Sequence, residues 1–371
     1  MDDKDRQLLT LLQKEIPLET RPFEALGRKI GLDGAEVILR IHRLKDEKII
    51  RQISAIFDTK SLGYKSMLVA MRFPEDKIDG GAAVINLHPG VSHNYKRSHE
   101  FNLWFTIAVP PKDAIEEHIE RLHHLSGSER TLNLPTLKLY KIGVKLDLTG
   151  RESKEENYEE IYDERRRRKI APDLTPLEID CIRAMQEDLP LTDEPYRKIA
   201  RELGTAEDGL FRTLQSFAAR GYLRRIAGIL HHRRAGFAAN AMFVWRVPEE
   251  KQDEAGSKMA LFREVSDCYR RPVYEEFSYA LYTMVHAPKI ADCEAIAARI
   301  EEKVGKWPRL NLVSTKEYKK VRLKYFTKEL DEWWERTGGL QNVLLMSFPQ
   351  CFSGNLMIRG SPIENFGDDR L

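Results

Sequence analysis

Apolar side chains recur every three or four residues in short segments near the start of the chain. Leu8, Leu9 and Leu12 follow this spacing in the first segment, and Val37 and Ile41 follow it in the third. Such spacing places apolar residues on one face of a helix. The pattern predicts helices over 4–14, 22–30 and 34–45, followed by a β-wing over 49–57. This is the order of a winged helix-turn-helix.

The next part of the chain reads strand, helix, strand, strand, helix, strand. The predicted strands cover 66–73, 91–97, 102–109 and 131–140, and the predicted helices cover 78–87 and 112–125. This βαββαβ order is ferredoxin-like, an antiparallel sheet with its helices on one face. The other face is left open, and we expect a partner or a ligand to cover it.

Both parts occur a second time about 173 residues further along the chain. Corresponding residues mark the repeat: Pro22, Gly31, Arg51 and Gly63 match Pro195, Gly204, Arg224 and Gly236. In the second copy the helices and wing are expected over 177–186, 195–203, 206–220 and 222–230. The sheet elements are expected over 240–247, 254–262, 265–271, 279–286, 290–303 and 310–316. The predicted fold class is therefore α+β, a tandem repeat of winged helix-turn-helix plus ferredoxin-like domain.

This organisation sets the predicted domain boundaries. Winged helix-turn-helix domains are expected over 1–58 and 174–231, ferredoxin-like domains over 59–150 and 232–326, a charged linker over 151–173 and a tail over 327–371. The four consecutive arginines of the linker are interpreted as a solvated face balanced by the acids before them. The tail gives no functional signal.

Composition narrows the class of protein. The 371 residues include 60 Lys and Arg against 58 Asp and Glu, a net charge of +2 that excludes a strong sequence-independent attraction to nucleic acid or anionic membrane. The four cysteines occur singly, which is typical of reduced thiols. We find neither a signal peptide nor an apolar run long enough for a membrane span, and expect a cytoplasmic, soluble protein.

Candidate chemistry concentrates in residues 90–109. If the segment over 91–99 is extended, alternation places His93, Tyr95, Arg97 and His99 on one face. A core face would carry Val, Ile or Leu, and a merely solvated face would not collect two imidazoles. The alternative is a set of surface histidines beside an aromatic interface. The candidate residues of this copy are His93, Tyr95, Lys96, Arg97, His99, Asn102 and Trp104.

The second copy carries a related but unequal segment over 265–287. Tyr269 matches Tyr95 and Arg271 matches Arg97, but Asp267 stands in place of His93. This divergence suits one asymmetric site built from two unequal halves. The candidate residues of the second copy are Tyr269, Arg270, Arg271, Tyr274 and His286.

The order of domains resembles the Lrp/AsnC family over about 1–148 and 174–326. In that family ferredoxin-like domains pair sheet to sheet, so two fused copies would form an internal pseudo-dimer, and a further homodimer stays open. Within it, HNYKRSHEFNLWFT and CYRRPVYEEFSYALYTMVH resemble the signature segments of the two siroheme decarboxylase subunits, here in one chain. Phe101 replaces the usual Tyr and Asp267 the usual His.

This resemblance implies non-oxidative removal of two acetate carboxyl groups from siroheme, giving 12,18-didecarboxysiroheme for heme or d1-type heme synthesis. The residues suit such a substrate, because a flat macrocycle with many carboxylates needs cationic groups and aromatic walls. Decarboxylation leaves a carbanion-like centre that needs a proton, and imidazole is a suitable donor. We hypothesise that His93 or His99 donates this proton while Arg97 holds a carboxylate. One histidine ligating the iron is the open alternative. No separate cofactor or protein-bound metal is expected, since the iron belongs to the substrate.

A DNA-binding regulator is the alternative function, and a non-catalytic tetrapyrrole-binding module is the third. In a regulator the third helix of each unit would enter the major groove, leading with its N-terminal residues. Those residues include Asp33 and Glu36 in one copy and Glu207 and Asp208 in the other. Carboxylates there would face phosphates, so we expect no DNA binding.

Overall fold

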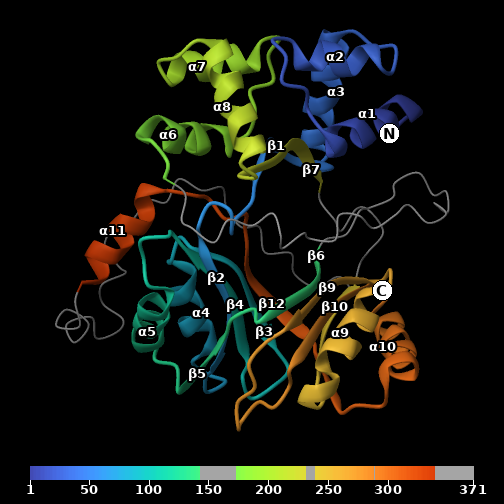
Figure 1. Cartoon of the computed structure of the whole chain (residues 1–371), viewed down its shortest axis with the longest axis vertical. Coiled ribbons are helices and arrows are strands. Elements are labelled where there is room, and N and C mark those ends of the chain that lie inside the picture. The colour runs from blue at the N-terminus through green and yellow to red at the C-terminus, as the bar shows by residue number, and fades with distance from the viewer. Residues whose placement is uncertain (143–172, 231–238, 288, 339–371) are drawn as a thin grey trace.

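The computed structural model describes residues 1–142, 173–230, 239–287 and 289–338. The predicted linker lies almost wholly outside these residues, as does most of the predicted tail. Two helical units form one end of the molecule and two sheets form the other (Figure 1). Among the described residues, no helix has both the length and the apolarity that a membrane span requires.

The helical units contain the three predicted helices each. They are α1 (Asp3–Lys14), α2 (Pro22–Arg28) and α3 (Gly34–Asp46), and α6 (Pro176–Met185), α7 (Pro195–Glu202) and α8 (Glu207–Ala219). Asp33 fixes the start of α3, because its side chain accepts a hydrogen bond of 2.7 Å from the Glu36 backbone N–H. The apolar faces of the helices meet in a core that runs through both units.

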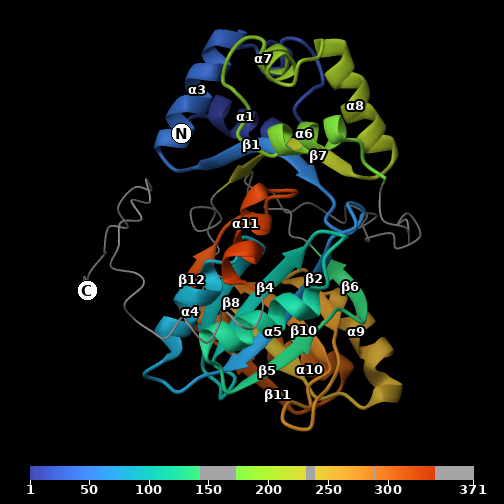
Figure 2. The same ribbon diagram turned by 90° about the vertical axis from the view of Figure 1, so that its left-hand side faces the viewer.

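The two predicted wings pair with each other. β1 (Ile50–Phe57) and β7 (Leu223–Leu230) form an antiparallel two-stranded sheet beneath the helices (Figure 2). Each unit thus supplies one strand, and the backbone groups of that strand are satisfied by the other unit. The pairing, together with the shared core, joins the two units into one body.

The ferredoxin-like elements form two five-stranded sheets. The first half supplies β2 (Lys65–Arg72), α4 (Ile78–Asn86), β3 (Val91–Arg97), β4 (Leu103–Val109), α5 (Ile115–Ser126), β5 (Arg130–Leu134) and β6 (Lys138–Ile142). The second supplies β8 (Ala239–Trp245), α9 (Gln252–Ala260), β9 (Val265–Arg270), β10 (Leu281–Ala287), α10 (Ile290–Val304), β11 (Arg309–Leu312) and β12 (Ser314–Lys320). The helices cover the outer faces of the sheets (Figure 1).

We expected a single last strand in each copy, and the structure corrects this. Each copy ends in two strands, and the second of them pairs with the sheet of the other half. The strand orders are β12-β3-β4-β2-β5 and β11-β8-β10-β9-β6, so the halves exchange β6 and β12. Pro135 lies between β5 and β6, where its missing N–H cannot continue the ladder. The prediction over 310–316 stopped short of the end of β12 at Lys320.

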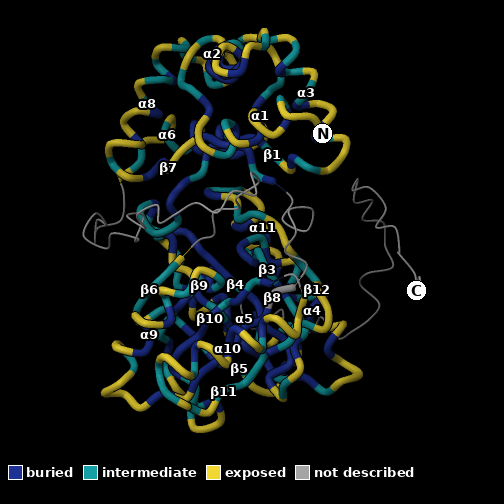
Figure 3. The backbone as a smooth tube through the Cα atoms, turned by 90° about the vertical axis from the view of Figure 1, so that its right-hand side faces the viewer, coloured by how far each residue is buried: buried dark blue, intermediate teal, exposed yellow. Residues whose placement is uncertain are grey.

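The open faces of the two sheets pack against each other, as the pairing expectation required. Trp104, Leu134, Val244, Phe277 and Tyr282 are among the buried residues of this shared core. The strands between the helix layers are mostly buried (Figure 3). Burial of large aromatic side chains on both faces supplies the hydrophobic gain that holds the halves together.

The start of the tail forms a helix that closes onto the first half. α11 (Lys328–Thr337) places Trp333 and Trp334 over His118 of α5, with ring centroids 5.8 and 4.4 Å away. His118 is buried beneath this helix. Its Nδ1 lies 2.9 Å from Nε2 of His88, also buried. The helical periodicity of α5 did not reveal this contact because the covering helix lies outside the repeat.

Candidate active site

Three predicted residues of β3 share the face that looks toward the second sheet. Tyr95 pairs with Trp104 of the inter-sheet core, and His93 pairs with Thr106. The His93 and Tyr95 rings stack with centroids 6.3 Å apart, and the Arg97 guanidinium carbon lies 5.6 Å from the Tyr95 ring centroid. The alternation predicted from the sequence is therefore present in the structure.

Arg97 is a buried cation without a carboxylate partner among the described residues. Its side chain is 6% exposed, and its Nη1 donates a 2.5 Å hydrogen bond to the Leu312 carbonyl of the other half. Within the described part of the chain, Nε has no hydrogen-bond partner. Burial lowers the pKa of Arg97 to about 10, which still leaves it charged at neutral pH. A buried, unneutralised guanidinium is an expected binding point for an anion.

The two histidines of this segment differ in their hydrogen bonds. The Phe101 backbone N–H donates to His99 Nδ1 over 3.1 Å, so neutral His99 carries its proton on Nε2. His93 Nδ1 lies 3.0 Å from the Ser92 hydroxyl, which can donate or accept. Burial lowers the pKa of both imidazoles, so both are neutral near pH 7. His99 lies beyond the end of β3, with its ring centroid 5.3 Å from that of Phe277.

The second half repeats the arrangement with different chemistry. Arg271 is buried, donates to the Leu134 carbonyl of the first half and lies over Tyr269 at 4.9 Å. The Ser266 hydroxyl donates to Asp267 over 2.6 Å and lies 2.9 Å from His286 Nε2. Asp267 therefore occupies the place of His93, while an imidazole approaches from the next strand.

Four other predicted residues have structural partners. Lys96 pairs with Glu75 and Arg270 with Asp253, both on the helix-covered faces of the sheets. The Asn102 amide donates to Phe73 O over 2.8 Å and accepts from Phe73 N over 3.0 Å. Trp104 donates to Phe101 O over 2.7 Å. The strand alternation had already placed Lys96 on the opposite face.

Tyr274 lies beside the inter-sheet core and donates to Asn133 O of the first half. Sequence reasoning missed Glu317 and Lys320 of β12, which pair with Tyr95 and His93. The signal was available in the repeat, since residues 316–320 correspond to 138–142, but predicting a single last strand hid it.

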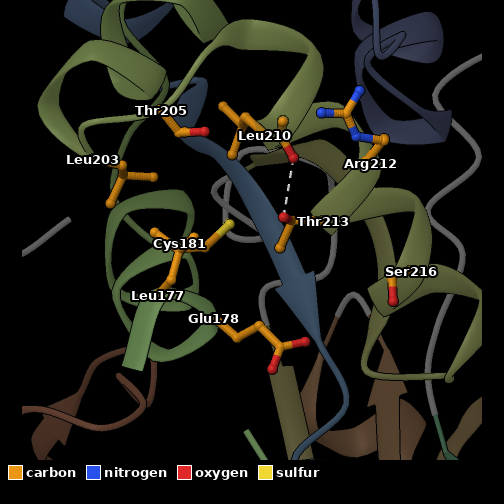
Figure 4. A pocket seen from close by; sticks show the side chains of 10 residues that line it. Leu177, Glu178, Cys181, Leu203, Thr205, Leu210, Arg212, Thr213 and Ser216 are labelled. Atoms are coloured by element: carbon orange, nitrogen blue, oxygen red, sulfur yellow. Dashed lines mark hydrogen bonds between the residues drawn. The ribbon is translucent and has the colours of Figure 1, made fainter. Parts of the chain in front are cut away.

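Two cavities occur in the helical units, away from these residues. One of about 300 Å³ lies between α6 and α8, where Leu177, Cys181 and Leu210 line its apolar side (Figure 4). Burial raises the pKa of the Cys181 thiol to about 12, so this thiol is unreactive. The other, of about 490 Å³, lies beside α2 and α3. Within the described ranges, no three His, Cys, Asp or Glu side chains are grouped to hold a metal ion.

Comparison with known families agrees with this architecture. The model described as AsnC-like ligand binding domain matches residues 61–141 and 234–319. The model described as Siroheme decarboxylase NirDL-like HTH domain matches residues 5–51 and 178–224. Both models thus match twice, once in each half of the chain.

Several relatives extend over most of the chain. The siroheme decarboxylase of Hydrogenobacter thermophilus is 38% identical and aligns with 90% of this chain and 98% of its own. The NirDL subunit of Paracoccus pantotrophus is 34% identical, over 79% of this chain and 87% of its own. A crystal structure of the siroheme decarboxylase NirDL in co-complex with an iron-uroporphyrin III analogue superposes with a TM-score of 0.72, at 32% identity over 90% and 98% of the two chains. The chain described here therefore belongs to the siroheme decarboxylase family, in the form that joins both subunit types in one polypeptide.

Proposed function

We propose that this chain is a carboxy-lyase that removes the carboxyl groups of two acetate side chains of siroheme without oxidation. The product would be 12,18-didecarboxysiroheme. Besides the family relationship, the observation that carries the proposal is Arg97, a buried guanidinium that lacks a carboxylate partner among the described residues. It lies over the Tyr95 ring, which stacks in turn with His93. A peripheral carboxylate of the substrate would supply the missing counter-charge.

The proposed reaction needs a positioned carboxylate and a proton donor. The bond between the acetate methylene and its carboxyl carbon breaks, CO₂ leaves, and the electron pair stays on the methylene carbon, delocalised into the macrocycle. A proton delivered to that carbon completes a methyl group. Arg97 would hold a neighbouring carboxylate, which orients the acetate that reacts. Tyr95 would pack against the macrocycle.

The hydrogen bonds of the two histidines distinguish their roles. His99 Nδ1 accepts from Phe101 N–H, which leaves a protonated Nε2 as a donor. Ligation of iron through His99 Nε2 would require the proton to move to Nδ1, against that N–H. His93 has the Ser92 hydroxyl at Nδ1, which accommodates either tautomer. Delivery of the Nε2 proton from neutral His99 would leave an imidazolate, and a second proton on its Nδ1 would face the Phe101 N–H. We therefore assign proton delivery to His93, because the Ser92 hydroxyl can accept from Nδ1 when both ring nitrogens carry a proton. His99 Nε2–H would donate a hydrogen bond to a carboxylate of the substrate, and ligation of the substrate iron by His93 is the alternative.

The regulator alternative receives no support from the helix that would enter DNA. Arg40 is paired with Asp2, Asp5 and Glu36, and Arg43 is paired with Asp5. Lys45 is paired with Asp188 of the other unit. Side chains neutralised in this way are not available for phosphates without breaking the packing of α1 on α3.

The deciding experiment is anaerobic incubation of the purified chain with siroheme, followed by mass spectrometry of the tetrapyrrole. The expected product has lost two carboxyl groups as CO₂. The His93→Gln variant is expected to be slowed by about 100-fold at saturating siroheme, since removal of a general acid typically costs that much. Siroheme that binds and is recovered unchanged would refute the enzyme and favour a sensor. Absence of both binding and turnover would refute the proposed function and leave only the description of the fold.

A further inference from the structure

The two halves differ most where the exchanged strands border the polar residues. On β12, Glu317 pairs with Tyr95 and Lys320 pairs with His93. On β6, Leu139 pairs with Tyr269 and Ile142 pairs with Asp267. The strand added to the sheet of β3 therefore carries charged side chains at these positions, whereas the strand added to the sheet of β9 carries apolar ones, although the two strands correspond in sequence.

The contacts of β12 show which of its side chains face the helix layer and which face the other sheet. Lys316 pairs with Asp79, and Lys319 donates to Asn86 O over 2.7 Å, so both face the helix layer. Residues directly opposite in an antiparallel ladder share a face, which puts Lys320 on the His93 side. In agreement, Lys320 is among the charges that lower the pKa of His93, after burial itself.

The β1–β7 sheet supplies a second cation near His93, the guanidinium of Arg51. The backbone N–H of Val321 donates to Ser92 O over 2.8 Å, and Arg322 binds the Ser54 hydroxyl and Ala55 carbonyl of β1. These contacts hold β1 next to the start of β3. Arg51 of β1 is exposed, and its charge also lowers the pKa of His93.

Arg51 differs from its counterpart in the second half. Arg224 is bound to Asp58, with Nε 3.0 Å from Oδ2. Arg51 forms no ion pair with any residue that the structure describes. Two cationic groups thus approach His93 from separate parts of the chain, Arg51 from β1 and Lys320 from β12.

We propose that Arg51 of the helical unit and Lys320 of the exchanged strand bind peripheral carboxylates of the tetrapyrrole and thereby direct it to the His93 side of the molecule. The inference rests on the proposed function for the identity of the ligand. It assigns the helix-turn-helix unit a substrate-binding role, because Arg51 lies on its paired wing strand. A ring with carboxylates around its whole edge can contact Arg97 at one side and this cation pair at another.

The test is equilibrium binding of iron-uroporphyrin III, which has eight carboxylates, and of iron-coproporphyrin III, which has four, followed by absorbance. Lys320→Ile, which installs the residue of the other half, and Arg51→Ala are each expected to weaken iron-uroporphyrin binding by about fivefold, because both groups are exposed. The loss for iron-coproporphyrin should be smaller. The double variant should show a flatter dependence of affinity on salt concentration than the unmodified chain.

Lys316→Ile is the matched control, since this lysine lies on the same strand but faces the helix layer. Lys320→Gln keeps an unbranched, polar side chain without the charge and should reproduce the loss, which separates the loss of the charge from any disturbance of the strand by Ile. Affinities of the Lys320 and Arg51 variants equal to that of Lys316→Ile would overturn the inference. Failure of the unmodified chain to decarboxylate siroheme while these binding losses persist would refute the proposed function alone.

Discussion

Acidification should loosen α11, because the two imidazoles beneath it are held neutral. Gly90 N–H donates to His88 Nδ1, so His88 carries its proton on Nε2 and donates to His118 Nδ1. A proton added at His118 Nδ1 would face that N–H directly. Burial, followed by the charge of Arg121, lowers the pKa of His118 to about 4, and burial also lowers that of His88. Protonation therefore opposes the folded arrangement.

The pKa difference fixes the sign and size of the effect. The unfolded chain binds the proton near the ordinary pKa of 6.5 and the folded chain only near 4, so stability falls as the pH drops from 6.5 toward 4. For His118 alone, the linkage amounts to about 0.2 kcal/mol at pH 7 and about 2 kcal/mol at pH 5. His88 adds a contribution of the same sign.

The assay is urea unfolding at pH 7 and pH 5, followed by tryptophan fluorescence, to which Trp333 and Trp334 beside His118 contribute. His118→Asn keeps an acceptor for His88 but removes the titrating group. We expect the unmodified chain to lose about 2 kcal/mol more than this variant between the two pH values. Equal losses in the two proteins would refute the reasoning, because the other histidines contribute to both.

Three further predictions test the site and its supports. Arg97→Met should weaken iron-uroporphyrin III binding by about tenfold or more. It should not lower the thermal midpoint, since the desolvation cost of the buried cation is removed. Unchanged affinity in an absorbance titration would contradict this prediction. Asn102→Ala should lower the free energy of unfolding by about 2 kcal/mol in urea titrations. It should leave turnover per folded chain unchanged, because the partners of the Asn102 amide among the described residues are backbone groups of Phe73. Gly256→Ala would place a methyl 2.5 Å from the Tyr140 ring of β6 and should cost about 1–3 kcal/mol, whereas Gly80→Ala meets nothing within 4 Å and should cost nothing.

The sequence predicted the repeat and the local elements because both depend on short-range patterns. The Asp33 cap, the apolar faces of α1 and α3, and the alternation along β3 are all local in this sense. The open face of each sheet predicted that a partner or a ligand covers it, and the resemblance to the Lrp/AsnC family implied that the two sheets pair.

The exchange of β6 and β12 could not be predicted, because a strand pairs equally well with either of two similar edges. Which edge it reaches depends on the turn after β5 and on the connection through the other half. The charges of Lys320 and Glu317 were missed for this reason. The burial of His118 was missed because α11 has no counterpart in the repeat.

Because of the strand exchange, the first sheet can be completed only after β12 has been synthesised. β3 is an edge strand of the first sheet until β12 adds to it, and β12 leaves the ribosome about 220 residues after β3. During that interval its free backbone groups are exposed to other chains, which is the situation in which edge strands aggregate. Asn94 and Lys96, together with the bulge at Ser92, interrupt the apolar character of that edge. We therefore expect the polar residues of β3 to limit aggregation of the nascent chain.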